Sequence, residues 1–175
     1  SKSHGSLTVT NRKAKYEVTL VANSSVGNTY DGTEKSATGV VTDKFTINGV
    51  EYTVSGYSTS NPTKKDAGKY ANTISGTYTV TDPAGNDVTE QFAVKTQNGE
   101  LVIGKRDVTL KSADLSKPYD GTALVNGETA LETEEGWVNG EGADYSFTGS
   151  QTLVGSSENV FSYTLKENTK ADNYN

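Results

Sequence analysis

Hydrophobic and polar residues alternate in short runs along this chain of 175 residues, and a period of two is typical of half-buried β-strands. Residues 39–47 and 50–54 carry such runs on either side of Asn48-Gly49, a pair that is typical of a two-residue hairpin turn. The pattern therefore predicts an antiparallel hairpin. It also predicts strands at residues 77–81 and 91–94, with a turn at residues 82–87.

The same order of motifs occurs twice. Residues 5–12 and 99–106 both contain the pattern Gly-x-Leu-x-aliphatic followed by an Arg. Each copy is followed by Val-Thr-Leu, at residues 18–20 and 108–110. We predict a strand in each of these four segments, and we interpret the chain as two copies of one small β-rich module.

The most distinctive repeated motif is Tyr-Asp-Gly-Thr. Because Gly accepts positive φ and an Asp side chain can bond the backbone two residues on, each copy predicts a turn. We expect the Tyr to pack at the edge of its module with its hydroxyl bonded nearby. The two copies are Tyr30, Asp31, Gly32 and Thr33, and Tyr119, Asp120, Gly121 and Thr122.

The repeated motifs predict where each module begins and ends. Tyr174 of the second module aligns with Phe92 of the first, so the second module is expected to lack the Gly-x-Leu-x-aliphatic strand that would come next. The linker at Gly104-Lys105-Arg106 is too short to flex widely, which predicts an elongated array. The predicted segments are residues 1–10, a seam strand of a preceding repeat or the first strand of module one; residues 11–104, module one; and residues 105–175, module two.

The middle of the second module has a different pattern. A short helix is possible at residues 128–134, where Gly127 and Gly136 leave room for only a couple of turns. Most other segments favour strands, so the expected fold class is mainly β.

Composition narrows the range of partners and cofactors. The chain has no Cys, which excludes disulfides and thiolate zinc sites. Its formal net charge of −6, with scattered Lys and Arg, gives no basic stripe for nucleic acid. No apolar run approaches the roughly 18 residues of a membrane span. We therefore expect no cofactor, no nucleic-acid partner and no membrane insertion.

Candidate catalytic and metal-binding residues are few. His4, the only His, lies near the start of the chain, so a Ser-His-Asp arrangement is poorly supported and we predict no enzyme activity. Glu132, Glu134 and Glu135 are best interpreted as a solvated acidic face. Residues 82–87 offer oxygen ligands of the type that Ca²⁺ prefers, but a plain Asx-type turn is the simpler interpretation.

Trp137 and Tyr145 are the candidate ligand contacts. Beside Gly136, Trp137 could form a platform on which a sugar stacks, or it could cap a thin core.

Several motifs together resemble a known family. Lys117-Pro118-Tyr119-Asp120-Gly121-Thr122 is followed by residues 148–156, Asn159 and Asn173-Tyr174, and residues 99–103 supply the seam. In this order they are similar to the YDG-type repeats of large bacterial surface proteins, which are related to the β-grasp-like, MBG-type modules of Gram-positive adhesins. The match spans nearly the whole chain, although module one departs from it at residues 60–65.

The resemblance implies an extracellular protein attached to the bacterial cell wall, in which such modules serve as stalk or spacer. It also implies a β-grasp-like fold, although the pattern alone equally allows an immunoglobulin-like sandwich. The alternative function is binding of a surface glycan or host protein through Trp137 and Tyr145.

The expected partners are flanking repeats of the same chain. A second copy could also add its strand at residues 5–11 to the open edge of module two, giving head-to-tail association. An intramolecular Lys–Asn amide bond, which some Gram-positive surface modules use where Cys is absent, stays an open alternative without assigned residues.

Overall fold

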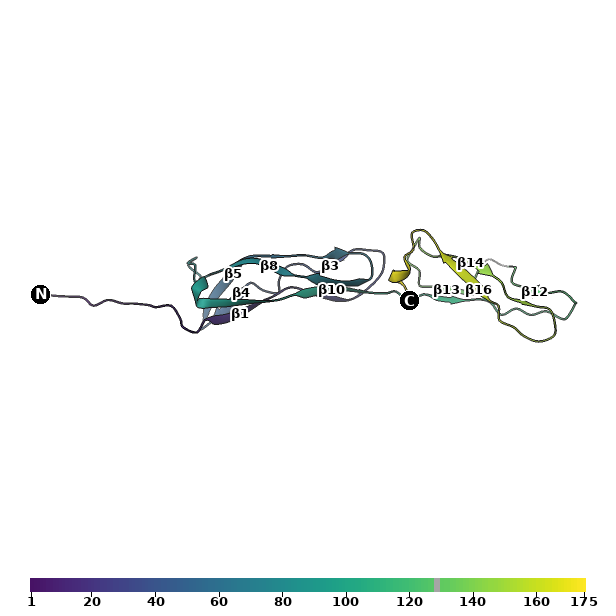
Figure 1. Cartoon of the computed structure of the whole chain (residues 1–175), viewed down its shortest axis with the longest axis horizontal. Helices are drawn as coiled ribbons and strands as arrows, with labels where there is room; N and C mark the ends of the chain where they lie inside the picture. Colours follow the sequence, from purple (N-terminus) through teal and green to yellow (C-terminus); the bar gives the residue numbers. More distant parts are fainter. Residues whose placement is uncertain (128–129) are drawn as a thin grey trace. The chain divides into compact units, whose positions relative to one another are not determined.

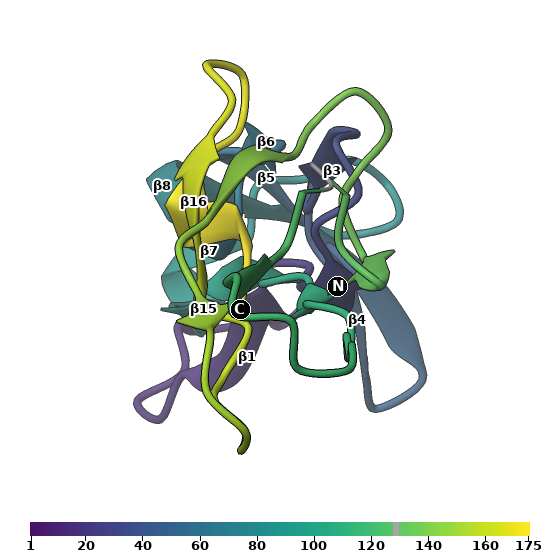
Figure 2. The ribbon, with the colours of Figure 1, turned by 90° about the vertical axis from the view of Figure 1, so that its right-hand side faces the viewer.

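The computed structural model describes residues 1–127 and 130–175. In these residues the chain is mainly β, as predicted, and its helical content is limited to two short 3₁₀ turns. They are η1 (Thr89–Gln91) and η2 (Ala171–Asn173). Both ribbon views show strands and loops without a long helix (Figure 1, Figure 2). Within the described ranges, no helix has the length and hydropathy that a membrane span requires.

The chain forms two compact units that do not follow a single cut in the sequence. Unit 1 contains Ser1–Val26, Lys35–Lys64 and Lys69–Val102, whereas unit 2 contains Gly27–Glu34, Lys65–Gly68 and Ile103–Asn175. Two short segments of the first half of the sequence, including the first Tyr-Asp-Gly-Thr motif, therefore belong to unit 2. The chain passes from one unit to the other five times.

Unit 1 is built from a parallel pair and an antiparallel sheet. Strand β1 (Tyr16–Val21) runs parallel to β9 (Phe92–Gln97), with Tyr16 opposite Phe92. The sheet has the order β4-β5-β8. Its strands are β4 (Lys44–Ile47), β5 (Val50–Thr59) and β8 (Ile74–Thr81), and the smaller β3 (Lys35–Ser36) pairs with β6 (Thr63–Lys64).

The alternation of apolar residues in these strands produces the core of unit 1. Its fully or almost fully buried members are Val18, Leu20, Val54, Val80 and Phe92. They come from β1, β5, β8 and β9, so the parallel pair packs on the antiparallel sheet. Burying side chains of this size stabilises the fold by about 1.5–3 kcal/mol each.

The predicted hairpin is confirmed. Ile47 pairs with Val50 across the turn, and Asn48 and Gly49 have φ values of 49° and 80°. Positive φ at both central residues is the mark of a type I′ turn, whose twist matches that of the flanking strands. The predicted turn at residues 82–87 is also confirmed, because Asp82 Oδ1 accepts the N–H groups of Ala84 and Asn86.

A third sheet places one strand between two others. Its order is β2-β10-β7, from β2 (Ser25–Thr29), β10 (Gly99–Gly104) and β7 (Gly68–Asn72). The central strand β10 is the predicted Gly-x-Leu-x-aliphatic segment. Leu101 and Ile103, on one side of it, are 0% and 2% exposed.

The strands of unit 2 that follow β10 are short and form two-stranded antiparallel pairs. They are β11 (Thr109–Lys111) with β13 (Thr133–Glu135), β12 (Leu124–Val125) with β15 (Ser150–Gln151), and β14 (Ala143–Phe147) with β16 (Phe161–Leu165). Arg106 also forms an isolated parallel bridge with Tyr174. Residues 112–120 and 152–160 contain no strand.

Two predicted strands are wrong or shortened. Residues 5–12 contain no strand, and Leu7 and Val9 are 103% and 99% exposed, because no strand of the described chain pairs with this segment. The predicted strand at 39–47 is confined to β4. The first half of this segment is bound by a side chain instead of a paired strand, since Asn23 Nδ2 donates to the carbonyl oxygens of Thr38 and Val40.

The helix predicted at residues 128–134 does not form in the part that is described. Residues 128 and 129 lie outside the described ranges, and Thr133–Glu135 is strand β13, paired with β11. Pairing with a distant strand outweighs a weak local helix preference in so short a segment.

Candidate functional site

The Tyr of the first Tyr-Asp-Gly-Thr motif lies in a largely buried cluster of unit 2. Tyr30, directly after β2, is 2% exposed, and its N–H donates to the carbonyl oxygen of Gly104 at 2.9 Å. Its hydroxyl donates to Glu141 Oε1 at 2.5 Å. Asp31 Oδ1 accepts the N–H and the hydroxyl of Thr33, which closes the predicted turn and aims the Tyr30 ring.

Glu141 receives a second phenol. Tyr174, which follows η2 and is 8% exposed, donates its hydroxyl to Glu141 Oε2 at 2.6 Å. Each carboxylate oxygen of Glu141 thus accepts one tyrosine hydroxyl, an arrangement of charge-assisted hydrogen bonds. The carboxylate is held next to β14 by a turn in which the Glu141 N–H donates to the Val138 carbonyl oxygen.

Aromatic rings pack around these hydroxyls. The ring of Tyr174 meets Tyr30 edge to face with centroids 5.5 Å apart, and it meets Trp137 in the same way at 4.8 Å. Edge-to-face contacts of this kind contribute about 0.5–1.5 kcal/mol beyond burial. We call Tyr30, Glu141, Tyr174 and Trp137 the tyrosine–glutamate cluster.

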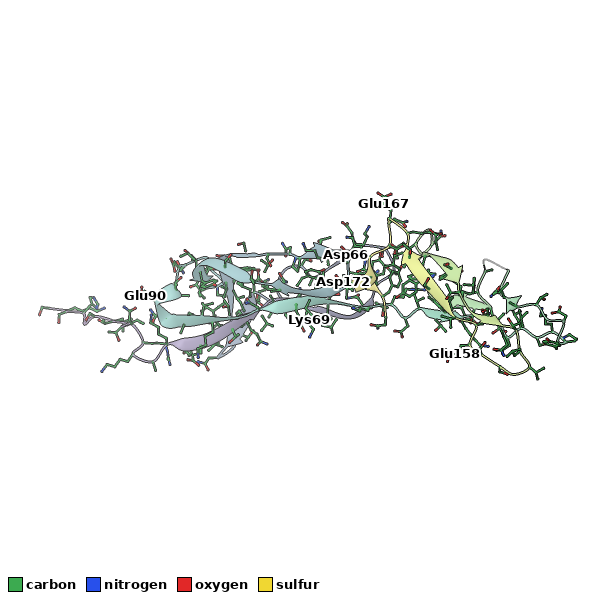
Figure 3. All side chains as sticks on the ribbon, turned by 45° about the vertical axis from the view of Figure 1, so that its right-hand side comes forward. Asp66, Lys69, Glu90, Glu158, Glu167 and Asp172 are labelled. Atoms are coloured by element: carbon green, nitrogen blue, oxygen red, sulfur yellow. The ribbon has the colours of Figure 1, made fainter. Side chains whose placement is uncertain are left out.

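A second buried polar group anchors residues 65–68 in unit 2. Asn173 is 1% exposed; its Oδ1 accepts the Ala67 N–H at 2.8 Å, and its Nδ2 donates to Asp66 Oδ1 at 3.0 Å. Asp66, labelled in Figure 3, forms an ion pair with Lys170 at 2.6 Å. Such partners offset the cost of burying an amide.

The electrostatics of the cluster favour protonated phenols. Burial, and then the hydrogen bond to Glu141, raise the pKa of Tyr174 to about 12 and raise the pKa of Tyr30 still further above its ordinary value. The hydrogen bonds from Lys170 and Asn173 lower the pKa of Asp66. Both tyrosines therefore remain hydrogen-bond donors to Glu141 at neutral pH.

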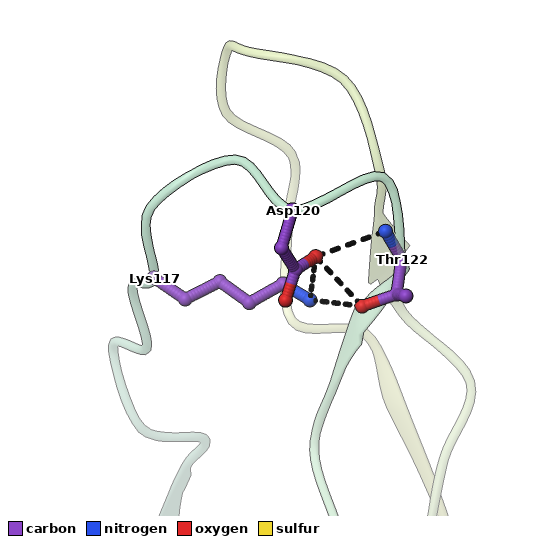
Figure 4. Close-up of polar contacts among 3 residues, drawn as sticks. All are labelled: Lys117, Asp120 and Thr122. Carbon is purple, nitrogen blue, oxygen red and sulfur yellow. Dashed lines mark hydrogen bonds and ion pairs between the residues drawn. The ribbon is translucent and has the colours of Figure 1, made fainter.

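The second Tyr-Asp-Gly-Thr motif has the same turn in a different setting. Asp120 Oδ1 accepts the N–H and the hydroxyl of Thr122, and Lys117 Nζ reaches Asp120 Oδ1 at 2.9 Å and Thr122 Oγ1 at 2.6 Å (Figure 4). The hydrogen bond from Lys117, followed by those from Thr122, lowers the pKa of Asp120. Tyr119 is 64% exposed, so the expectation that the Tyr of each motif packs is wrong for this copy.

Trp137 and Tyr145, the predicted ligand contacts, are neighbours in the structure. Trp137 Nε1 donates to the Tyr145 hydroxyl at 3.1 Å, and that hydroxyl donates to Glu134 Oε1 at 2.9 Å. Both rings are half-buried. A cavity of about 340 Å³ lies beside Trp137 and is lined mainly by apolar residues, among them Leu110, Phe161 and Tyr163.

The other candidate residues are exposed or have partners of their own. His4 is exposed in the strand-free N-terminal residues, and Glu132 forms an ion pair with Lys111. Asp82 uses its carboxylate within its own turn, also accepting from Asn86 Nδ2. Among the described residues, no group of three or more His, Cys, Asp or Glu side chains is placed to hold a metal ion.

The sequence did not indicate the roles of Glu141 and Asn173 in this site. Glu141 is one of several Glu residues in an acidic, Gly-bounded stretch, and Asn173 stood out only as part of the Asn173-Tyr174 motif. Only folding shows that one accepts two phenols and that the other is buried.

Comparison with protein-family models, with curated proteins and with solved structures gives no match for this chain.

Proposed function

We propose that this chain consists of two tandem β-grasp-like modules that act as spacer repeats in an extracellular bacterial adhesin. The repeated order of motifs supports the tandem arrangement. The pairings support it too: Tyr16 lies opposite Phe92 in a parallel pair, and Arg106, at the corresponding place in the second repeat, forms a parallel bridge with Tyr174. A parallel pair also departs from the purely antiparallel sheets of an immunoglobulin-like sandwich.

The observation that carries the spacer function is the way in which unit 2 is assembled. It includes residues 27–34 and 65–68, with Tyr30 and Asn173 buried where these segments pack. Five passages of the chain, rather than one linker, connect the units. A spacer needs such a connection, because a single flexible linker would let the distal end of an array collapse towards the cell.

Small-angle scattering of the 175-residue chain tests this function. We expect one rigid conformation to fit the profile. A wild-type profile that needs a broad distribution of conformations would contradict the spacer function.

Cell-surface location is tested separately. An antibody raised against the folded chain should stain intact cells that produce the parent protein, and protease treatment of those cells should remove the signal. Staining that requires permeabilised cells would contradict an extracellular role.

The cavity beside Trp137 favours ligand binding as the second candidate function. Its volume of about 340 Å³ falls in the range of small-molecule sites, and Tyr163 at its margin is 57% exposed. A glycan array compares the wild type with Trp137→Phe and Tyr163→Ala. Binding that both substitutions weaken, at unchanged melting temperature, would support this function, whereas no binding by the wild type would exclude the glycans tested.

A further inference from the structure

A cavity of about 900 Å³ in unit 2, called the large cavity below, lies between two lengths of chain. Residues 111–119 form one wall and residues 149–161 the other, with residues 124–126 contributing between them. Both walls contain stretches without strand structure, at 112–120 and 152–160. Glu158, labelled in Figure 3, lies on the second wall with its side chain exposed.

Apolar side chains are exposed along this cavity. In a soluble domain, large apolar groups gathered around one hollow indicate a surface that a partner covers. The exposed fractions are 45% for Leu115, 64% for Tyr119, 55% for Val125, 72% for Leu153, 90% for Val154 and 47% for Val160.

The repeat relates these walls to two paired strands in the first half of the chain. Residues 114–118 align with β2 and residues 155–159 with β7, and in the β2-β10-β7 sheet the strand between those two is β10. The cavity therefore lies where the first repeat has a central strand.

One hydrogen bond supports this alignment in space. In the first repeat, Asn72 Nδ2 donates to the carbonyl oxygen of Asn23 at 3.0 Å. In the second, Asn159 Nδ2 donates to the carbonyl oxygen of Ala113 at 3.0 Å. An equivalent Asn thus joins the two walls at an equivalent point.

The start of β10 shows what such a strand must carry. A Cβ on Gly99 would lie 2.3 Å from the carbonyl oxygen of Asn23, so only Gly fits where the strand passes this backbone. Two and four residues later, Leu101 and Ile103 are buried. The requirement is therefore Gly, then apolar residues at alternating positions.

Residues 5–9 meet this requirement and are unpaired. Gly5 aligns with Gly99, Leu7 with Leu101, and Val9 with Ile103. Leu7 and Val9 are almost completely exposed, and nothing lies within 4 Å of a Cβ built on Gly5. The segment thus has the sequence of a central strand without the contacts of one.

We propose that residues 5–10 of a second copy of this chain enter the large cavity of unit 2 as a middle strand, with Gly5 passing Ala113 and with Leu7 and Val9 facing inward. The main-chain groups of both walls then gain partners, and the exposed apolar side chains are covered. Because donor and acceptor are different surfaces, the contact is heterologous and joins copies head to tail, in rings or in open chains.

Sedimentation velocity of the 175-residue chain over a wide concentration range tests this proposal. We expect the mass to rise with concentration in the wild type. Gly5→Val and the double variant Leu7→Asp with Val9→Asp should lose the rise completely, although they remain folded because these positions are exposed. The control variant is Ser3→Asp with Ser6→Asp, which adds the same two negative charges. Ser3 precedes the proposed strand and Ser6 faces outward from it, so this variant should associate as the wild type does.

A self-complemented variant tests whether the cavity is the acceptor. The sequence of residues 94–104 is appended after Asn175, so that a Gly-Glu-Leu-Val-Ile strand can fill the cavity from within the same chain. This variant should stay monomeric at every concentration and should no longer bind a fluorescent peptide of residues 3–12, which the wild type should bind.

Two results would overturn the proposal. A wild type that stays monomeric and does not bind the peptide would overturn the proposal. Association that persists in the Leu7 and Val9 double variant, or in the self-complemented variant, would show another interface and would overturn it as well.

Discussion

The two Tyr-Asp-Gly-Thr motifs have the same local structure and different surroundings. In each, the Asp Oδ1 accepts the N–H of the Thr at 2.9 Å, and φ of the Gly is 79° or 78°. Tyr30 is nevertheless 2% exposed and Tyr119 is 64% exposed. The motif therefore encodes a turn, and the burial of its tyrosine depends on what the turn meets.

This difference leads to predictions that compare equivalent positions. Trp137 is the only Trp and belongs to unit 2, so its fluorescence reports the unfolding of that unit directly.

The largest expected effect is on Tyr30. Tyr30→Ala removes a buried ring and one donor to Glu141, and it should lower the free energy of unfolding of unit 2 by about 3–5 kcal/mol. Tyr119→Ala should change it by less than about 0.5 kcal/mol, because that ring is mostly exposed. Urea denaturation followed by Trp137 fluorescence measures both, and equal losses would contradict the assignment of the cluster.

Glycine substitutions give the next largest difference. Gly32→Ala and Gly121→Ala both place a side chain on a residue with positive φ, which should lower the free energy of unfolding by about 1–2 kcal/mol each. A Cβ at Gly32 would also lie 2.9 Å from Val138 Cγ1, whereas at Gly121 the nearest atom, the Tyr119 hydroxyl oxygen, is 4.0 Å away. This overpacking should lower the free energy of unfolding by about 1–3 kcal/mol more in Gly32→Ala alone. Thermal unfolding of the two variants should separate them, and identical melting temperatures would contradict this reasoning.

Glu141→Gln tests the carboxylate that accepts both phenols. Gln offers one acceptor oxygen where Glu offers two, so one tyrosine hydroxyl loses its acceptor, and the free energy of unfolding should fall by about 1.5–3 kcal/mol. Glu167→Gln is the matched control, because Glu167 is exposed (Figure 3). Equal unfolding midpoints for the two variants in urea would remove Glu141 from the cluster.

Alkaline pH should destabilise unit 2 through the same tyrosines. The pKa of Tyr174 is raised to about 12, and that of Tyr30 is raised further, from the ordinary value of about 10. The stabilisation is fully present below pH of about 10 and is lost as the pH rises through about 12, because the unfolded chain releases these protons first. Trp137 fluorescence during alkaline titration, repeated with Tyr30→Phe, should show a weaker dependence in the variant.

The smallest effect concerns the ion pair in the exposed motif. The pKa of Asp120 is lowered from its ordinary value of about 3.9, chiefly by the hydrogen bond from Lys117. The ionised Asp120 therefore stabilises the fold at pH values above about 3.9, and this stabilisation is lost as the pH falls through the lowered pKa. Lys117→Gln should raise the pKa of Asp120 towards the ordinary value, as measured by NMR titration of its carboxyl carbon. Because the ion pair is solvated, the melting temperature should stay almost unchanged.

Elements that depend on neighbouring residues could be predicted from the sequence, whereas elements that depend on distant residues could not. The hairpin at Asn48-Gly49 and the Asp-Gly turns were predicted correctly because neighbouring residues determine them. The strand at residues 5–12 was predicted from a valid alternation of Leu7 and Val9, yet a strand needs a partner, and no part of the described chain supplies one. The helix near residues 128–134 was wrong in its described part because β11 pairs with Thr133–Glu135.

The sequence by itself determined the mainly β character, the turns and the repeated order of motifs, because these follow from backbone preferences and from a period of two. The tertiary structure alone decided that Glu141 accepts the hydroxyls of Tyr30 and Tyr174, and that Tyr119 stays exposed. Those outcomes depend on pairs of residues far apart in the chain, whose side chains meet only after the strands have packed. Identical motifs therefore have different burial, since burial belongs to the surroundings of a residue rather than to its neighbours in sequence.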